Sequence, residues 1–512
     1  MPEQTLVKTI GFYSEVREKS SRKSDRSHFF RLSLYQGKID NEVKAMHAVT
    51  SAKKPKKKAP SVLKEGFDSF KEMCKKSDLL TRLSFFIFGA GCFLRGQIVK
   101  GFLFLAVQIV YIAYMIASGW GYIKMLPTLG ESAMKKVFDE SIGIYRNVPG
   151  DNSLLILLFG VAAIFMTIFA LVIAYKSFRA AYLGQCRREK GQKQPTFMQE
   201  IRALGDENLH KTLITPPLAA LFLFTVLPLV FMILMAFTNF DKAHQPPGNL
   251  FTWVGLQNFK DVFWQNPQKS STFFSLFIWT LTWAFFATFS SYFGGVIVAL
   301  LINKKTIKLK KVWRTIFVMS IAVPQFVSLM LVGRILQDLG PLNALLMQWG
   351  IIKEPVHFVS DGNLARIMVI IVNLWVGIPY TMLSTTGILM NIPADMYESA
   401  RIDGANAIQT FFKITLPHML FVTAPALITA FVGNINNFNV IYFLTGGGPY
   451  TLEYFQAGKT DLLVTWLYKL TINDQNYALA STIGILVFVI TATFSLVFYN
   501  QSSSVKRGGD FS

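Results

Sequence analysis

Polar side chains at helical intervals interrupt two of the long apolar runs in this sequence. Asn373, Gly377 and Tyr380 stand at i, i+4 and i+7, which places them on one face of a helix. Asn434 and Asn437 stand at i and i+3 in the next apolar run. An amide both donates and accepts hydrogen bonds, and a small residue leaves room for a ring, so this set suits a sugar-like ligand. The same residue types also join helices inside membranes, and spacing alone leaves both interpretations open.

The elements that must position these side chains are membrane-spanning helices. The chain has 512 residues, of which 52% are hydrophobic and 16% are charged. Apolar runs of about 20 residues, long enough to cross a bilayer, recur along it. The shorter run 83–94 is expected to be interfacial or re-entrant, and the N-terminal region shows no pattern of a cleaved secretory signal. The expected fold is an all-α polytopic membrane protein with about eight spans, near 101–119, 153–175, 214–238, 274–303, 312–335, 366–390, 419–442 and 480–499.

The distribution of charge predicts the orientation of these spans. The net charge is +21, and about eighteen Lys and Arg fall in the first 80 residues, with a KKPKKK run among them. Segments 176–211 and 304–314 and the C-terminal tail are also basic. Cytoplasmic loops collect Lys and Arg, so both termini and the loop 391–418 are expected in the cytoplasm. The basic N-terminal region is expected to be solvated and to contact anionic membrane lipid rather than nucleic acid.

These observations predict four regions in the chain. They are a basic, partly disordered cytoplasmic extension at 1–80, an accessory segment with two membrane helices at 81–210, a six-helix core at 211–500 that contains the loop 391–418, and a cytoplasmic tail at 501–512.

The sequence contains little that could perform covalent or ion-coupled chemistry. No Asp or Glu falls inside the eight expected spans, which argues against a proton or sodium symporter, although a carbonyl-lined sodium site stays open. The AGKT stretch at 457–460 ends like a phosphate loop, but Glu453 occupies the position of the first glycine. Cys74, Cys92 and Cys186 lack a CxxC spacing. We therefore predict no catalytic residue, no metal ligand and no cofactor in this chain.

The loop 391–418 has the signals of two short helices around a tight turn. Pro393 suits a first helical position, and Gly404 permits a left-handed cap after the first helix. A second short helix carries AIQTFF, and Pro417 is expected to prevent its smooth continuation into the next span. Small residues beside the turn would let another backbone approach closely. From the residues alone, an ordinary helix lying on the membrane surface remains an alternative.

This loop resembles the EAA loop of ABC importer permeases. In that family the loop forms a coupling helix that docks in a cleft of the cytoplasmic ATPase subunit. The resemblance implies a transport subunit that is not itself an enzyme. It also implies three partners, which are a second permease subunit, an ATPase dimer that binds ATP and Mg²⁺, and an extracellular lipid-anchored sugar-binding protein. The matching positions are Glu398, Ser399, Ala400, Asp403, Gly404, Ile414, Leu416 and Pro417.

Other stretches between about 210 and 500 are similar to the MalF-type permeases of maltose and maltodextrin importers. Examples are AFTNFD from Ala236, NLWVGIPYTM from Asn373 and NNFNVIYFLTGGGPYTLEY from Asn436. Gram-negative members carry a large folded insertion after the third span, whereas the loop 239–272 here is short, which favours a Gram-positive type of importer.

In that family the transported sugar is held mid-membrane by this subunit. The positions that match the family's site are Asn373, Gly377, Tyr380, Asn434 and Asn437, together with Gln325, whose side chain is changed. Ile321, Ala430 and Gly433 fall where the enteric maltose permease has larger or polar side chains, so the exact oligosaccharide stays open.

The resemblance implies a cell-membrane permease that passes maltose or a maltodextrin inward by alternating access. Three alternatives remain at this point. They are a permease of the same class for another oligosaccharide such as a raffinose-type sugar, an ion-coupled secondary carrier, and a channel or scaffold.

Overall fold

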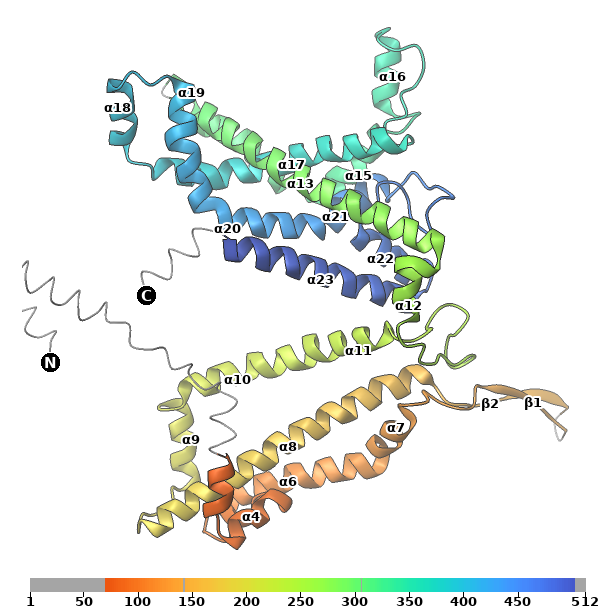
Figure 1. The fold of residues 1–512 in the computed structure, drawn as a ribbon, viewed down its shortest axis with the longest axis vertical. Helices are drawn as coiled ribbons and strands as arrows, with labels where there is room; N and C mark the ends of the chain where they lie inside the picture. The colour runs from red at the N-terminus through yellow and green to blue at the C-terminus, as the bar shows by residue number, and fades with distance from the viewer. Residues whose placement is uncertain (1–69, 141–142, 305, 502–512) are drawn as a thin grey trace, which may run out of the picture. The chain divides into compact units, whose positions relative to one another are not determined.

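The computed structural model describes residues 70–140, 143–304 and 306–501 (Figure 1). Most of the basic extension predicted over 1–80 and nearly all of the tail predicted over 501–512 lie outside the described residues. The described residues divide after Arg82 into two units, and the arrangement below concerns the unit from Leu83 onward. The described residues are mostly helical, which confirms the expected all-α membrane fold.

Seven helices among the described residues are long and apolar enough to cross a membrane. They match seven of the eight expected spans. Four of them are single α-helices, namely α8 (Ser153–Glu189), α13 (Pro267–Asn303), α17 (Gly362–Met390) and α23 (Tyr477–Gln501). The other three each contain two labelled α-helices. They are Ile98–Met125 with α6 (Ile98–Tyr114) and α7 (Trp120–Met125), Leu209–Met235 with α10 (Leu209–Leu221) and α11 (Leu227–Met235), and Ala407–Ile435 with α19 (Ala407–Thr410) and α20 (Leu416–Ile435).

The segment expected to span at 312–335 is apolar enough to do so, but it is sharply bent. The structure has two helices there, α14 (Lys310–Ala322) and α15 (Gln325–Ile335), which meet at an angle of 87°. Val323 between them is extended, with φ −81° and ψ 131°. The ring of Pro324 disfavours a helical conformation for the residue before it, so the helix ends at this point. Hydropathy alone contains no information about this bend.

The span expected at 419–442 also breaks near its end. α20 stops at Ile435, and α21 (Phe438–Thr445) begins after Asn437. The Asn437 side-chain oxygen accepts a hydrogen bond from the Val440 amide at 3.2 Å and so caps the new helix.

Several shorter elements complete the described chain. Figure 1 shows α18 and α19 at one end of the spanning helices, and α12, α16 and the hairpin at the opposite end. The shorter elements are α4 (Leu79–Phe86), α5 (Ala90–Phe93), the antiparallel strands β1 (Lys135–Asp139) and β2 (Ile144–Val148), α9 (Phe197–Gly205), α12 (Gln257–Lys260), α16 (Pro341–Gln348), α18 (Ala394–Ile402) and α22 (Leu463–Ile472).

The run 83–94 does not form a span, in agreement with the prediction. It contributes to α4 and contains α5, and both helices are too short to cross a membrane. The Ser177 hydroxyl of α8 accepts a hydrogen bond from the Gly89 amide at 2.7 Å and donates to the Ser84 carbonyl at 2.9 Å. These bonds satisfy the backbone at the turn between the two helices.

α13 lies against both α17 and α20. Its contact with α17 runs over glycines. A Cβ added at Gly295 would overlap Thr381 of α17, and one added at Gly377 of α17 would overlap Ser291 of α13. Small residues therefore allow the two backbones to approach closely, as they commonly do where membrane helices pack tightly.

The Gly295→Ala substitution is expected to destabilise the fold by about 1–3 kcal/mol, because the new methyl group overpacks the α13–α17 contact. Gly387→Ala on α17 is the matched control, since nothing lies within 4 Å of its added Cβ. Thermal unfolding of the detergent-solubilised protein measures both variants. Equal unfolding temperatures would contradict the importance of this contact.

Candidate functional site

A cavity of about 190 Å³ lies between α13, α17 and α20. It brings together four of the six residues that sequence reasoning placed in a sugar site, which are Asn373, Gly377, Tyr380 and Asn434. The other lining residues are mostly small or hydroxylated, namely Ala287, Thr288, Ser291, Tyr292, Thr381, Ser384, Thr385, Thr423, Ala426, Leu427 and Ala430. The cavity can thus offer many hydrogen-bonding groups and no formal charge, which suits a neutral polar ligand.

The two remaining predicted residues do not line this cavity. Asn437 lies directly behind the lining, where its Nδ2 donates to Asn434 Oδ1 at 3.1 Å. Gln325 is the first residue of α15, half-buried, and it stands apart from the lining residues.

The predicted residues in the cavity differ widely in exposure. The Asn373 side chain is only 5% exposed, and its Nδ2 lies 3.4 Å from both the Ala287 carbonyl and Ser291 Oγ on α13. Tyr380 is 71% exposed, so its ring extends away from the packed helices. Asn373 is therefore held in place by the fold, whereas Tyr380 is free to contact a ligand or another chain.

Sequence reasoning missed the contribution of α13 to this cavity. Thr288, Ser291 and Tyr292 all come from the stretch TFSSY, a concentration of hydroxyls within an apolar span. The Tyr292 hydroxyl lies 2.9 Å from the Thr423 hydroxyl of α20 and joins these helices at one end of the cavity. The hydroxyl cluster in this stretch was the available signal.

The segment 391–418 connects α17 to α20, the two helices that carry the predicted site residues. α18 ends at Ile402, and Gly404 has φ +77°, which confirms the predicted left-handed turn. Pro393 stands immediately before the helix rather than at its first position. The Tyr397 hydroxyl lies 3.1 Å from the Thr415 hydroxyl and fastens α18 to the following helix.

Near Pro417 the α-helical pattern is interrupted, as expected, but the helix does not break. The chain is helical without a break from Ala407 to Ile435, through a π-helical turn at Phe411–Thr415. Pro417 lies in the first turn of α20, directly after this turn. A π-helical turn changes the local hydrogen-bonding pattern, which accommodates a residue that lacks an amide proton.

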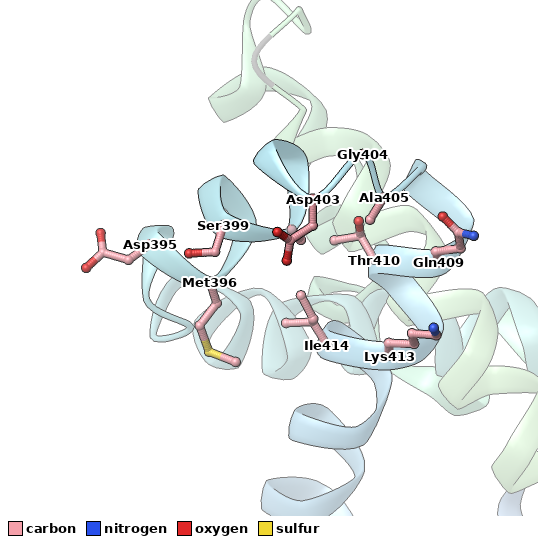
Figure 2. A pocket seen from close by; sticks show the side chains of 11 residues that line it. Asp395, Met396, Ser399, Asp403, Gly404, Ala405, Gln409, Thr410, Lys413 and Ile414 are labelled. Carbon is pink, nitrogen blue, oxygen red and sulfur yellow. The ribbon is translucent and has the colours of Figure 1, made fainter.

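An open hollow of about 750 Å³ lies between α18 and the start of the next helix (Figure 2). Of the eight positions matched to the EAA loop, Ser399, Ala400, Asp403, Gly404 and Ile414 line it, as do Asp395, Met396, Ala405, Gln409, Thr410 and Lys413. Glu398, Leu416 and Pro417 are not among the lining residues. Ala400 is 9% exposed, whereas Ser399 is exposed.

Large apolar side chains of this segment are open to solvent in the isolated chain. Ile402 is 86% exposed, Ile408 is 69% exposed and Phe412 is 60% exposed. Several exposed apolar side chains within one short segment are typical of a protein-binding surface.

Comparison with known proteins identifies the family. Residues 291–507 match the model of the binding-protein-dependent transport system inner membrane component. The galactooligosaccharides transport system permease protein GanP of Bacillus subtilis is 34% identical over 425 residues, which cover 82% of this chain and 96% of that protein. The chain belongs to this family of ABC importer permeases.

Two further comparisons extend the similarity. The maltodextrin transport system permease protein MalC of Streptococcus pneumoniae is 31% identical over 85% of this chain and 98% of its own length. Among solved structures, a chain of a bacterial ABC transporter involved in alginate import aligns at 22% identity over 59% of this chain and 97% of its own, with a TM-score of 0.46. The family model and the sequence relatives show that the protein is a multi-pass membrane permease and a transport subunit rather than an enzyme.

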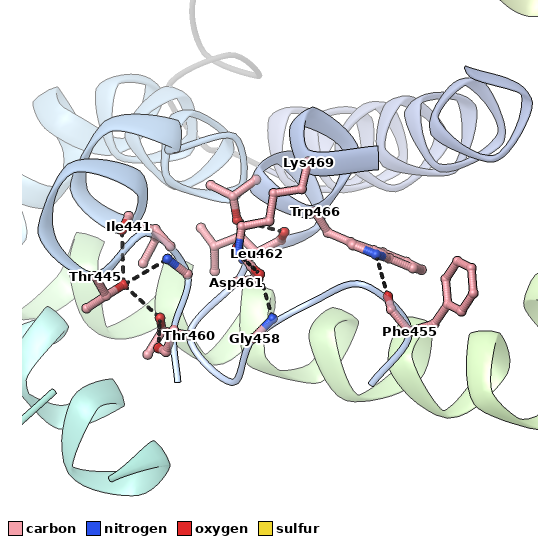
Figure 3. Close-up of polar contacts among 12 residues, drawn as sticks. Ile441, Thr445, Phe455, Gly458, Thr460, Asp461, Leu462, Trp466 and Lys469 are labelled. Atoms are coloured by element: carbon pink, nitrogen blue, oxygen red, sulfur yellow. Dashed lines mark hydrogen bonds and ion pairs between the residues drawn. The ribbon is translucent and has the colours of Figure 1, made fainter. Parts of the chain in front are cut away.

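At the end of the helices opposite the segment 391–418, a loop is held by several polar contacts (Figure 3). This loop comprises residues 446–462, and we call it the distal loop. Asp461 and Lys469 form an ion pair at 2.6 Å, with side chains 0% and 3% exposed. The Gly458 amide donates to the same Asp461 oxygen at 2.7 Å. A Cβ on Gly447 would overlap the Asp461 carboxylate, so this position requires glycine.

Burial raises the pKa of Asp461, and the Lys469 ammonium opposes this shift.

The distal loop is also hydrogen-bonded to two spanning helices. Trp279 of α13 donates to the Thr460 carbonyl at 3.1 Å, and Arg366 of α17 donates to the Lys459 carbonyl at 2.7 Å. The buried ion pair therefore holds a loop that joins α13 to α17 at their distal ends.

The Lys469→Met substitution is expected to cost about 3–5 kcal/mol, because it leaves the Asp461 charge buried without its partner. Without the ammonium, the pKa of Asp461 in the folded state rises further. The folded state then keeps a proton that the unfolded chain has released, so stability falls as pH rises. We expect the unfolding temperature of this variant to be lower at pH 8 than at pH 5, by more than in the unmodified protein.

The controls use the same loop. Asp461→Asn combined with Lys469→Met removes both charges and is expected to recover part of the loss. Lys459→Met alters a lysine that is 37% exposed and is expected to change stability by less than about 1 kcal/mol. A Lys469→Met variant with the pH dependence of the unmodified protein would contradict the role of the pair.

Proposed function

We propose that this permease passes a maltodextrin from an extracellular binding protein to the cytoplasm by alternating access, driven by a separate ATPase dimer. The observation that carries this proposal is the uncharged cavity between α13, α17 and α20, whose two flanking helices are linked by the segment 391–418. A polyhydroxylated ligand needs amide and hydroxyl groups in a site of this kind. The similarity to a maltodextrin permease over 85% of the chain supports the choice of sugar.

The size of the cavity supports a second permease subunit. Ligand sites of drug-sized molecules enclose roughly 300–1,000 Å³, and the cavity here is about 190 Å³. Tyr380 borders it and is 71% exposed, so the site is open on one side in the isolated chain. A second, related subunit facing this opening would complete the enclosure around the sugar.

The charge of the loops supports a cytoplasmic location for both termini and for the segment 391–418. The segment from Lys304 to Arg314 holds six Lys and Arg and no acidic residue, and it follows the end of α13. Figure 1 places that end of α13 with α18 and α19. Because Lys and Arg collect on the cytoplasmic side, this end of the helices faces the cytoplasm. The distal loop and the hairpin then face outward, toward the binding protein.

The hollow of the segment 391–418 supports docking to the ATPase, which would hold ATP and Mg²⁺. Small residues line it, and the same segment exposes Ile402, Ile408 and Phe412, which a partner would bury. In this proposal residues 211–500 form the six-helix permease core, and 81–210 form an accessory membrane segment. The basic region 1–80 and the tail 501–512 extend into the cytoplasm, where basic residues favour anionic lipid.

A galactooligosaccharide is the second candidate substrate, and one observation favours it. The GanP relative is 34% identical over 82% of the chain, a higher identity than that of the maltodextrin permease. Competition between labelled maltotriose and unlabelled galactooligosaccharides during uptake distinguishes the two sugars.

Asn434→Ala and Tyr380→Ala are each expected to reduce sugar uptake severely. A hydrogen bond to a ligand is worth about 1–3 kcal/mol when its partner stays buried, which corresponds to roughly 5- to 160-fold in binding. Uptake of labelled maltotriose into cells measures the effect, with co-purification of the ATPase as the assembly control. Normal uptake by both variants would show that these residues pack against other helices and do not bind the sugar.

A cysteine at Ser399 is expected to form a cross-link to an ATP-hydrolysing protein in native membranes. Ser399 is exposed and lines the hollow, whereas Ala400 is 9% exposed and less accessible to a reagent. The native residues Cys74, Cys92 and Cys186 are first replaced. Leu452→Cys in the distal loop is the control, since Leu452 is 97% exposed at the opposite end. If Ser399→Cys captures no ATPase, the docking proposal is wrong.

A further inference from the structure

α13 places two hydroxyl groups one helical turn apart at the wall of the cavity. Thr288 and Ser291 are 4% and 6% exposed, and each receives a hydrogen bond from an asparagine on a different helix. Asn434 of α20 donates through Nδ2 to Thr288 Oγ1 at 2.9 Å. Asn373 of α17 donates through Nδ2 to Ser291 Oγ at 3.4 Å. The two asparagines that line the cavity are therefore both held by the same helix.

These bonds determine which part of each amide faces the cavity. An asparagine side chain has two N–H donors and one carbonyl oxygen with two lone pairs. Where an N–H group is held by α13, the carbonyl end is directed away from that helix. Within the part of the chain that the structure describes, Asn373 Oδ1 receives no hydrogen bond, so it can accept one from a ligand hydroxyl.

The Asn434 amide is fixed from both ends. Its Nδ2 contacts Thr288, and its Oδ1 accepts from Asn437 Nδ2 at 3.1 Å. The Asn437 oxygen in turn caps α21 through the Val440 amide at 3.2 Å. The Asn434 backbone carbonyl accepts from the Trp283 indole of α13 at 3.1 Å. One N–H of the amide and one lone pair of its oxygen remain for a ligand.

We propose that Thr288 and Ser291 are positioning residues that orient Asn434 and Asn373 toward the transported sugar. This inference rests on the proposed function, because it deepens the description of the same cavity. Thr288 fixes the amide of Asn434 on α20, and Ser291 fixes the amide of Asn373 on α17. α13 thus sets the pattern of donors and acceptors that a sugar meets on both facing helices, and so contributes to the choice of sugar.

The experiment uses the complete transporter in proteoliposomes with its binding protein and maltotriose. It measures the number of sugar molecules transported per ATP hydrolysed. Thr288→Val keeps the shape of the side chain but removes the hydroxyl, and Thr288→Ser keeps the hydroxyl. We expect Thr288→Val to lower the ratio by about fivefold or more, because the Asn434 amide loses its fixed orientation, and Thr288→Ser to retain it. Ser291→Ala is expected to act in the same direction on the Asn373 side.

The matched control is Thr282→Val on the same helix. The Thr282 hydroxyl donates to the Ile278 carbonyl of its own helix at 2.9 Å and lies outside the cavity lining. A general loss of α13 packing would lower sugar transport and ATP hydrolysis together and leave their ratio unchanged. That outcome, or equal effects of Thr288→Val and Thr288→Ser, would overturn the inference. If Thr288→Val does not fold, the same ratio of sugar transported to ATP hydrolysed, measured for Ser291→Ala and Thr288→Ala, tests the inference instead.

A failure of the inference can be separated from a failure of the proposed function. Asn434→Ala and Asn373→Ala are measured in the same proteoliposomes. If these variants lose transport while Thr288→Val and Ser291→Ala keep the normal ratio, only the positioning role is wrong. If the asparagine variants also transport normally, the cavity is not the sugar site, and both proposals are wrong.

Discussion

The close contact between α13 and α17 is the constraint on which the rest of this structure depends. Gly295 and Gly377 lie where any larger side chain would meet the facing helix. Because the two backbones approach so closely, the Asn373 amide comes within hydrogen-bonding distance of Ser291. The same helix α13 also contacts α20, so one element serves as the reference for both walls of the cavity.

A second constraint is that polar backbone groups within a membrane need partners inside the protein. The structure provides such partners at the end of α20 and in the distal loop. At the end of α20, Asn437 caps α21 through the Val440 amide. At the distal ends, indole and guanidinium groups of α13 and α17 donate to carbonyls of the distal loop. At these two places, side chains therefore satisfy part of the irregular backbone.

Features that depend on nearby residues were predictable from the sequence. The spacing of Asn373, Gly377 and Tyr380 placed them on one face of a helix, and all three do line one cavity. Gly404 was expected to adopt a left-handed conformation, and it does. These predictions succeeded because helical periodicity and the freedom of glycine are local properties.

Features that depend on contacts between distant segments were not predictable in the same way. The hydroxyls of α13 gain their role from Asn434, which is 146 residues from Thr288 in the chain. The bend at Pro324 had a sequence signal in the proline itself, but its angle of 87° depends on the packing of the two helices. The uninterrupted helix through Pro417 depends on the π-helical turn before it, for which the sequence offered no clear sign.

The unbroken helix from the segment 391–418 into the cavity wall has a mechanical consequence. α20 alone contains 20 residues, so it acts as a rod about 30 Å long. If docking at α18 tilted that rod by about 10°, its far end would move by about 5 Å, close to the pitch of one helical turn. The lever arm would amplify a small displacement in the water phase into a shift large enough to separate Asn434 from the helix that faces it.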